Sequence, residues 1–517
     1  MRNPRLVLAA VSVTVLAGAL AGPSLAAPSA APAHTTTDGC LASVPETAGG
    51  APVQICYSIH KPASASTRKR VPMVLHSHGW AGSRSKSADS FASWLDQGFG
   101  VLTIDQRGFG ESGGKAHIED PDFEGQDIMR IVDVVAGLPW VAQERKGDPV
   151  LGAIGGSYGG GYQLVGAFTE LMTKGKTRFD ALAPEITWWS LSESLAPNAV
   201  PKTTWSSALY AAGMASDAHT TPVHEGLAYA VATGQWPDGT VPGFDLEGFL
   251  ENNGPAWHVA QGRKLDIPVL FRQGITDSLF PLDQGLKIFD QALTKRARAK
   301  SIFTGYNGGH VLPATFPLGL ATGADTCSAK LGSKSFTELS QRFMRTHLLG
   351  LAAGLKGAGQ YHLTTADGAG CLTVDSVKAD APYPIGVVAS TAAAGAPVSV
   401  KVADGPITIA GTPTVQALVT SAGVDNRVFT ALSIGTSAAD AKTVQGVVQP
   451  QRELLPTQGA QRTWTLPSVS VSVPAGQSLF LTLSPVSEMF AAHGSRTPGA
   501  FLLQDAVVTL PLVERVR

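Results

Sequence analysis

The chain has 517 residues, of which 57 are glycine, and it carries 39 basic and 40 acidic side chains. A formal net charge of −1 offers no basic field for nucleic acid, and it argues against an acidic tail or a polybasic membrane patch as the working surface. The hydrophobic fraction of 44% excludes a disordered chain, and the length predicts roughly two to four domains.

Residues 1–26 have the pattern of a secretory signal peptide. Arg2 and Arg5 precede an apolar run over residues 6–21, and residues 24–26, Ser-Leu-Ala, offer the small side chains that a signal peptidase reads. A membrane anchor is the weaker alternative, because glycine and proline interrupt the run before it provides the ~20 strongly apolar residues of a span. We therefore expect a secreted protein, and no later run is long and apolar enough to cross a bilayer.

The four cysteines are expected to oxidise in that compartment. Nearest-neighbour pairing, Cys40 with Cys56 and Cys327 with Cys371, is the simplest of the three possible connectivities, and the sequence leaves the choice open. No Cys-x-x-Cys spacing indicates a metal or redox site.

A parallel sheet flanked by helices is predicted after a leader and N-terminal segment at residues 27–65, whose first part, to about residue 38, is rich in Pro, Ala and Thr. Strands are expected at residues 71–77, 101–105 and 150–155, and helices at residues 87–95, 128–138 and 162–172. This alternation of strand and helix predicts that residues 66–185 are the first part of an α/β core.

The pattern changes at residue 186. Residues 186–260 contain Trp-rich and Ala-rich stretches broken by proline, without an obvious strand, and they predict a helical cap. Strand-like runs at residues 267–273 and 301–306, followed by an amphipathic helix at residues 336–349, predict the second part of the core at residues 261–375.

The hydrophobic period becomes two in residues 380–517. Alternating or apolar runs occur at residues 398–402, 415–420, 469–473 and 479–483. Helical patterning there is limited to residues 438–442. The segment therefore predicts an all-β domain, a sandwich or jelly roll.

Residues 155–159, Gly-Gly-Ser-Tyr-Gly, fit the Gly-x-Ser-x-Gly nucleophile elbow. Glycine makes up about 11% of the chain, so the motif alone is weak, and a second copy surrounds Ser112. Ser157 follows an apolar strand and opens an apolar helix, as the elbow requires, whereas the residues after Ser112 open no such helix. We therefore identify Ser157 as the candidate nucleophile and interpret Ser112 as a loop residue.

A serine nucleophile needs a base to accept its proton and an acid to orient that base, and in this topology both follow later strands. Asp277 comes after the strand at residues 267–273 and is the candidate acid. Asp283 is its rival, but it follows Pro281 in the expected first turn of the next helix, where an acidic side chain complements the helix dipole.

One histidine after the candidate acid directly follows a predicted strand. His310 ends the run Tyr-Asn-Gly-Gly-His after the strand at residues 301–306. His347 lies within the amphipathic helix, and His362 and His493 lie near or beyond the end of the core. His310 is therefore the candidate general base.

The oxyanion of a tetrahedral intermediate needs two fixed donors. They are expected to be the N–H of Tyr158, directly after the nucleophile, and the N–H of Trp80, in the loop after the first strand. His76 and His78 have no nearby carboxylate or cysteine, so we interpret them as structural or pocket-lining residues rather than metal ligands. This chemistry requires no cofactor or metal.

The elbow, the turn at residues 105–113, the acid and base loops, the helical insertion and the trailing β domain together resemble the X-Pro dipeptidyl-peptidase and cocaine esterase group of α/β-hydrolases. The resemblance covers about residues 70–517. It implies an α/β-hydrolase core, a helical cap, a C-terminal jelly roll and a catalytic triad of Ser157, Asp277 and His310. Members commonly use a Tyr hydroxyl as the second oxyanion donor, whereas this sequence has Trp80, so we expect backbone donation.

Together with the signal-peptide pattern, the resemblance leads us to predict a secreted serine hydrolase that resembles X-Pro dipeptidyl-peptidases and cleaves a small ester or a short peptide amide through an acyl-enzyme on Ser157. A pure carboxylesterase for apolar or aryl acyl esters is the alternative, and a non-catalytic secreted binding protein with a vestigial core is an alternative of another class. The oligomeric state is open.

A dipeptidyl-peptidase must bind a substrate ammonium, usually with carboxylates. The candidate carboxylates in or near the cap are Glu185, Glu193, Glu225 and Asp245, unless they are merely solvated. Trp188 and Trp189 would suit an apolar or aryl group in the substrate pocket, and their alternative role is the core of the cap.

Overall fold

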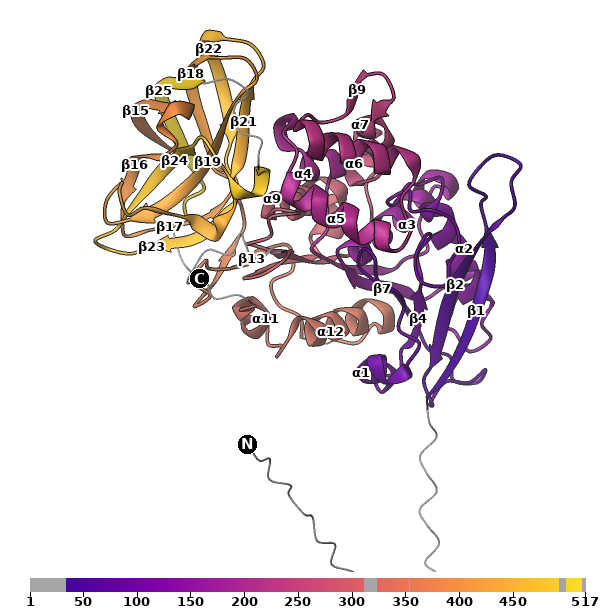
Figure 1. Ribbon diagram of the computed structural model, residues 1–517. Coiled ribbons are helices and arrows are strands. Elements are labelled where there is room, and N and C mark those ends of the chain that lie inside the picture. The colour runs from indigo at the N-terminus through magenta and orange to yellow at the C-terminus, as the bar shows by residue number, and fades with distance from the viewer. Residues whose placement is uncertain (1–33, 311–322, 353, 492–498, 514–517) are drawn as a thin grey trace, which may run out of the picture. The chain divides into compact units, whose positions relative to one another are not determined.

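A ten-stranded mixed sheet forms the centre of the computed structural model, which describes residues 34–310, 323–352, 354–491 and 499–513 (Figure 1). The predicted signal peptide and His493 lie outside the described residues. In sheet order the strands are β1 (Thr35–Ser43), β2 (Val53–Lys61), β4 (Gly100–Ile104), β3 (Met73–Ser77), β7 (Leu151–Gly156), β8 (Ala181–Glu185), β11 (Leu270–Gly274), β12 (Ile302–Tyr306), β13 (Tyr361–Thr364) and β14 (Cys371–Val374).

The strands from β4 to β13 in this order pair in parallel, whereas β1 with β2, β2 with β4, and β13 with β14 pair antiparallel. Parallel strands end at the same edge of a sheet, so the loops that follow β3, β7, β8, β11 and β12 lie along one edge. This edge is where an open α/β sheet binds its ligands.

The two faces of the sheet are covered by different helices, because successive strand residues point to opposite sides. On β3, Met73 and Leu75 pack in the same core as α2 (Glu124–Gly137) and α3 (Tyr158–Lys174). Val74 instead packs in the same core as α1 (Ala92–Leu95) and α12 (Phe336–Leu349), on the opposite side in Figure 1. Three short helices complete this part: α9 (Leu282–Lys287), α10 (Lys295–Arg298) and α11 (Thr326–Lys330).

The cap comprises helices α4 to α8. They are α4 (Leu191–Leu195), α5 (Thr203–Ala215), α6 (Thr221–Thr233), α7 (Leu246–Leu250) and α8 (Pro255–Ala260). A short hairpin of β9 (Asp238–Val241) and β10 (Phe244–Asp245) interrupts them, although the sequence pattern indicated no strand here. Its residues are mostly exposed, so they lack the apolar alternation by which a half-buried strand is recognised.

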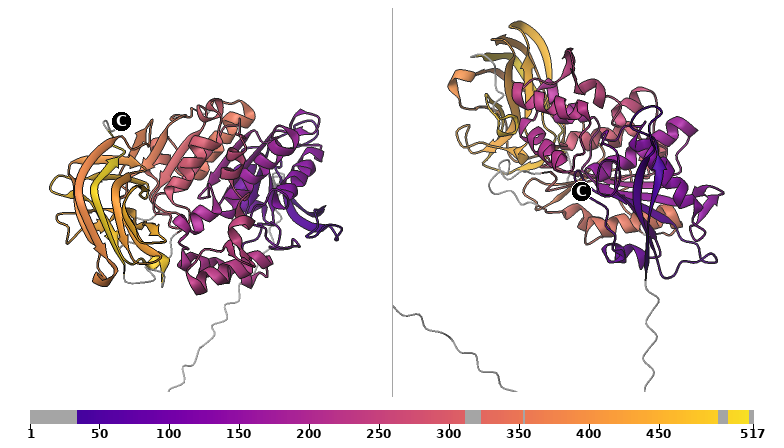
Figure 2. Two further views of the ribbon diagram at one scale, coloured as in Figure 1. Left: turned by 90° about the horizontal axis from the view of Figure 1, so that it is seen from above. Right: turned by 45° about the vertical axis from the view of Figure 1, so that its right-hand side comes forward.

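Strands β15 to β25, which we call the β domain, form two larger antiparallel sheets and one two-stranded sheet around their own core (Figures 1 and 2). One sheet has β15 (Ala381–Thr391), β25 (Ala500–Leu510), β18 (Thr414–Ala422) and β22 (Thr457–Thr465). The other has β16 (Val398–Asp404), β24 (Ser478–Ser484), β19 (Asn426–Gly435), β20 (Lys442–Thr443) and β21 (Gln449–Glu453), and β17 (Ile407–Gly411) pairs with β23 (Val469–Val473). This arrangement, with the α/β core, confirms the predicted fold class.

The structure differs from the sequence-based expectations in four further places. β1 begins at Thr35, within the expected leader, and forms a hairpin with β2 that extends the sheet. Strand β8 was not predicted, and β13 and β14 continue the sheet beyond α12. Residues 438–442 form no helix, because the Asp440 carboxylate accepts hydrogen bonds from the N–H groups of Thr436 (3.2 Å) and Ser437 (2.6 Å) and stabilises a turn instead.

Two disulfides connect the nearest neighbours in sequence. Cys40–Cys56 joins directly opposed residues of β1 and β2, and Cys327–Cys371 joins α11 to β14. The first fixes the register of a hairpin whose outer strand is largely exposed. Of the helices in the described ranges, none has the length and apolar character of a membrane span.

Candidate active site

Ser157 lies on a strained turn between β7 and α3. Its backbone has φ 58° and ψ −124°, a conformation that non-glycine residues rarely adopt and that is typical of functional sites. The neighbouring glycines make the turn possible: a Cβ on Gly155 would lie 2.4 Å from the Gly159 carbonyl oxygen, and one on Gly159 would lie 2.3 Å from the Ser77 oxygen. The geometry is that of a nucleophile elbow.

The turn places two backbone donors beside Ser157. Tyr158 is the first residue of α3, so its N–H is among those that a helix leaves unpaired and that favour negative charge. A Cβ on Gly79 would lie 3.9 Å from the Ser157 Cβ, which brings the loop containing Trp80 next to the nucleophile. Neither the Tyr158 N–H nor the Trp80 N–H donates to a described residue.

His78 fixes the shape of that loop. Its Nδ1 donates to the Gly79 oxygen at 2.8 Å, and its Nε2 accepts from the Gln106 N–H at 3.1 Å. Burial lowers the pKa of His78, and it lowers the pKa of His76, which packs against Phe91, to about 4. Both rings are therefore structural, and no cluster suited to a metal ion occurs among the described residues.

Asp277 and His310 are in direct contact. His310 Nδ1 lies 2.7 Å from Asp277 Oδ2, and Asp277 Oδ1 accepts the N–H groups of Leu279 (2.9 Å) and Phe280 (2.8 Å). Because the buried carboxylate accepts from Nδ1, the proton of the neutral ring is on Nδ1, and Nε2 is left as an acceptor. Nε2 has no hydrogen-bond partner among the described residues, Ser157 included.

The sheet register relates these residues to the elbow. Gly156 pairs with Glu185 on β8, Glu185 pairs with Arg272 on β11, and β11 is paired with β12 up to Tyr306. The elbow and the loops of the candidate acid and base therefore all lie at one edge of the sheet. Catalytic hydrogen bonds are often long or unmade before substrate binds, so an unmade bond between serine and histidine is compatible with this role.

The rival residues have other functions. Asp283 lies in the first turn of α9 and pairs with Lys287 at 3.2 Å. Ser112 Oγ donates to the Asp105 oxygen at 2.7 Å and accepts the Cys56 N–H at 2.8 Å, so it connects two parts of the core. His347 is in α12 and packs against the ring of Phe343, away from the acid and base loops.

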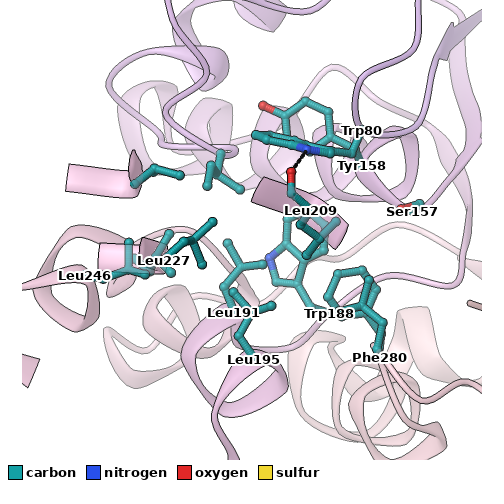
Figure 3. A pocket seen from close by; sticks show the side chains of 14 residues that line it. Trp80, Ser157, Tyr158, Trp188, Leu191, Leu195, Leu209, Leu227, Leu246 and Phe280 are labelled. Atoms are coloured by element: carbon teal, nitrogen blue, oxygen red, sulfur yellow. Dashed lines mark hydrogen bonds between the residues drawn. The ribbon is translucent and has the colours of Figure 1, made fainter. Parts of the chain in front are cut away.

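An apolar cavity begins at Ser157 and extends under the cap. Its volume free of protein atoms, including the part that is open to solvent, is about 560 Å³. Its lining residues, apart from Ser157, are Trp80, Ile118, Tyr158, Trp188, Leu191, Leu195, Leu209, Val223, Leu227, Leu246, Leu250, Leu279 and Phe280. Figure 3 shows Ser157 at one end of this set and Leu246 at the other. No side chain among the lining residues that the structure describes carries a charge.

The two candidate pocket tryptophans have different places. Trp188 lines the cavity and its Nε1 donates to the Asn253 oxygen at 2.7 Å. Trp189 does not line it, because it is buried in the main core, where its N–H donates to the Gln284 side chain at 3.1 Å. Sequence reasoning missed the aliphatic residues of α5, α6 and α7, which the helical pattern does not distinguish from core residues.

None of the candidate carboxylates lines the cavity. Glu185 pairs with Arg272 at 2.8 Å and Glu193 with Lys287, whereas Asp245 accepts the N–H of Gly248 at 2.8 Å and Glu225 is exposed. Glu119, which the sequence did not indicate, is buried behind Trp188. Burial raises its pKa well above the usual value, which favours the uncharged carboxyl.

Comparisons with known proteins identify the family and the fold. A model of the X-Pro dipeptidyl-peptidase (S15) family matches residues 49–311. The chain is also 29% identical over 104 residues to an uncharacterized 31.7 kDa protein of the traX-finO intergenic region of Escherichia coli, a match that spans 20% of this chain and only 35% of that protein.

Solved structures share the fold along nearly the whole chain. An aminopeptidase from a marine sediment Thaumarchaeota archaeon has a TM-score of 0.65 and 13% identity, over 95% of this chain and 98% of that one. An α-amino acid ester hydrolase has a TM-score of 0.60 and 14% identity over 95% and 98%. A CocE/NonD family hydrolase from Staphylococcus aureus has a TM-score of 0.59 and 12% identity over 92% and 97%.

At such low identity the structural neighbours establish the fold only. The family model, in contrast, matches about half of the chain and includes the elbow and the loops that hold Asp277 and His310. The chain is therefore an enzyme, a serine hydrolase, and it belongs to the X-Pro dipeptidyl-peptidase (S15) family.

Proposed function

We propose that this protein is a secreted carboxylic ester hydrolase for apolar acyl groups, with Ser157 as nucleophile, His310 as general base and Asp277 as the acid that orients it. The observation that carries the substrate proposal is the uncharged lining of the cavity that starts at Ser157. An ammonium group placed there would lose its hydration without gaining a counter-ion, which is strongly unfavourable. An aliphatic or aryl acyl group would be bound by removal of its apolar surface from water.

In the proposed reaction, Ser157 Oγ attacks the ester carbonyl carbon and transfers its proton to His310 Nε2. The oxyanion accepts hydrogen bonds from the N–H groups of Tyr158 and Trp80. His310 returns the proton to the leaving alcohol, and the acyl-enzyme remains on Ser157. A water molecule, deprotonated by His310, then attacks the acyl carbonyl. The bond between Ser157 Oγ and the acyl carbon breaks, His310 returns the proton to Ser157 Oγ, and the acid is released.

Secretion is part of the proposal. It is supported by the signal-peptide pattern of residues 1–26 and by two disulfides, which persist in oxidising compartments. Dipeptidyl-peptidase activity is the second candidate, and the family assignment favours it.

The two candidates predict different substrates. We expect kcat/KM for p-nitrophenyl esters to rise at least about 10-fold from acetate to octanoate, because each added methylene group buries more apolar surface. Gly-Pro p-nitroanilide is expected to remain uncleaved. Anilide hydrolysis that disappears when the substrate amine is acetylated would contradict the esterase proposal and establish an aminopeptidase.

Leu209 offers a direct test of the acyl site. It lies on α5, is half-buried and lines the cavity, so an amide at this position would be tolerated by the fold. Leu209→Asn is expected to lower kcat/KM for the octanoate ester about 10-fold while changing the acetate ester much less, because only the longer chain reaches the site. Met214→Asn is the matched control, since Met214 is on the same helix but is exposed and outside the lining. Equal losses on both esters would argue against an acyl pocket here.

A further inference from the structure

The residues at the start of α5 contact the loops that hold the candidate acid and base. Lys202 precedes the helix and is 3% exposed, and its Nζ donates to the Leu279 oxygen at 3.0 Å. The N–H groups of Leu279 and Phe280 are the two donors that hold Asp277 Oδ1. Lys202 therefore fixes the peptide segment that orients the carboxylate of Asp277.

Trp205 makes a second contact, with the loop of the base. Its Nε1 donates to Ser278 Oγ at 3.0 Å, and Ser278 Oγ in turn donates to the His310 oxygen at 3.2 Å. The indole also packs edge to face against the His310 ring, and the centroids of the two rings are 6.1 Å apart. Trp205 thus contacts both the backbone of the base, through Ser278, and its ring.

The two residues between Lys202 and Trp205 form hydrogen bonds with the β domain. Thr203 Oγ1 donates to the Ala491 oxygen at 2.8 Å, and Thr204 Oγ1 donates to the Glu488 oxygen at 2.6 Å. Four consecutive residues therefore bind the acid loop, the base loop and the β domain. A helix end that only packed in the core would not need these four side-chain hydrogen bonds.

We propose that residues 202–205 are the positioning element of the Asp277–His310 pair, with Lys202 and Trp205 as positioning residues. Hydrogen bonds to the β domain hold the element, and the element holds the carboxylate and the imidazole in their reacting geometry. This inference rests on the proposed function, because it assumes that Asp277 and His310 carry out the reaction.

Lys202 also places a positive charge near the Asp277–His310 pair. Three carboxylates face it: Glu193 from α4, Asp277 from the acid loop and Asp283 from α9. Burial lowers the pKa of Lys202 to about 8, and the carboxylates oppose that shift, so the side chain is a cation at neutral pH. A buried cation beside Asp277 opposes a second positive charge at the Asp277–His310 pair. Removal of the cation is therefore expected to change the pH dependence of the reaction.

Lys202→Met tests the charge and the contact together. We expect kcat for p-nitrophenyl butyrate to fall about 10-fold with KM changed less than about 2-fold, because Lys202 lies outside the cavity lining and loss of its bond to the Leu279 oxygen mainly displaces the reacting groups. We also expect the acid limb of the kcat/KM profile to move to higher pH by about half a pH unit or more.

Lys287→Met is the matched control. Lys287 pairs with Glu193 and Asp283 but contacts neither catalytic loop, so kcat and the acid limb should both remain at the wild-type values.

Trp205→Phe tests the second contact, because it keeps an aromatic ring but removes the N–H donor to Ser278, together with part of the indole that packs against His310. It is expected to lower kcat without moving the acid limb of the pH profile.

If Lys202→Met folds, as judged by its thermal melt, and keeps both the kcat and the acid limb of the wild type, the inference is wrong. If it does not fold, an unchanged kcat for Trp205→Phe overturns the inference. A wild-type enzyme that neither hydrolyses the ester nor reacts with a fluorophosphonate would instead refute the proposed function.

Discussion

Ser157→Ala is expected to lower kcat/KM for apolar acyl esters by about 10⁴-fold or more, because no other group can form the acyl-enzyme. Steady-state kinetics with the octanoate ester measure this loss. Covalent labelling by a fluorophosphonate probe should disappear in the same variant, and mass spectrometry of the labelled wild-type protein should find the adduct on the peptide that contains Ser157. The thermal midpoint should change little, since Ser157 Oγ has no hydrogen bond to a described residue.

Ser112→Ala is the control, because Ser112 occupies the second Gly-x-Ser-x-Gly motif of the chain. This hydroxyl bonds to the Cys56 N–H and the Asp105 oxygen, so its loss is expected to cost about 1–3 kcal/mol of stability and to leave labelling intact. Labelling that survives in Ser157→Ala and disappears in Ser112→Ala would identify Ser112 as the nucleophile and would refute the proposed site.

The parts of the site that could be predicted from sequence are those set by local order along the chain. Ser157 was distinguished from Ser112 by the strand before it and the helix after it, and the backbone conformation of Ser157 has the same cause. Asp277 and His310 were chosen because each follows a strand, and they are in contact for that reason. Parallel strands bring such loops to one edge whatever the length of chain between them.

The rest depends on contacts that no local pattern encodes. Leu209, Leu227 and Leu246 come from three cap helices, and apolar residues at helical spacing indicate a buried face without showing whether protein or substrate covers it. Trp188 and Trp189 show the same limit of sequence-based prediction. They are adjacent residues of one type, but Trp188 lines the cavity and Trp189 is buried in the main core. The β1 strand was missed because its polar sequence is held in the sheet by pairing and by the Cys40–Cys56 disulfide.

The apolar lining also explains why the family does not determine the substrate. The elbow and the acid and base loops lie at the sheet edge, and under the proposed function they supply a hydrolytic centre that accepts any suitably placed carbonyl. The cap supplies most of the lining, and here it contributes leucine and valine where a peptidase for free amines would need carboxylates. Under the proposed function, α4 to α7 therefore contribute most to substrate choice.

Asp277→Asn is expected to reduce kcat/KM by about 10³- to 10⁴-fold at neutral pH. The N–H groups of Leu279 and Phe280 would continue to hold the side-chain oxygen, so the amide NH₂ would face His310 Nδ1. Nδ1 would then have to accept a hydrogen bond, the proton of the ring would move to Nε2, and the base could no longer accept the proton of Ser157. Ester turnover and the rate of fluorophosphonate labelling should fall together, because both require that proton transfer.

Asp283→Asn distinguishes the two candidate acids. Asp283 pairs with Lys287 and contacts no catalytic group, so this variant should keep kcat/KM within about 2-fold of the wild type, as expected for a partly exposed ion pair. The reverse result, an inactive Asp283→Asn and an active Asp277→Asn, would move the acid to α9. It would also remove the reason for the contacts of Lys202 and Trp205 with the acid and base loops, because the positioning element would then hold a carboxylate that takes no part in the reaction.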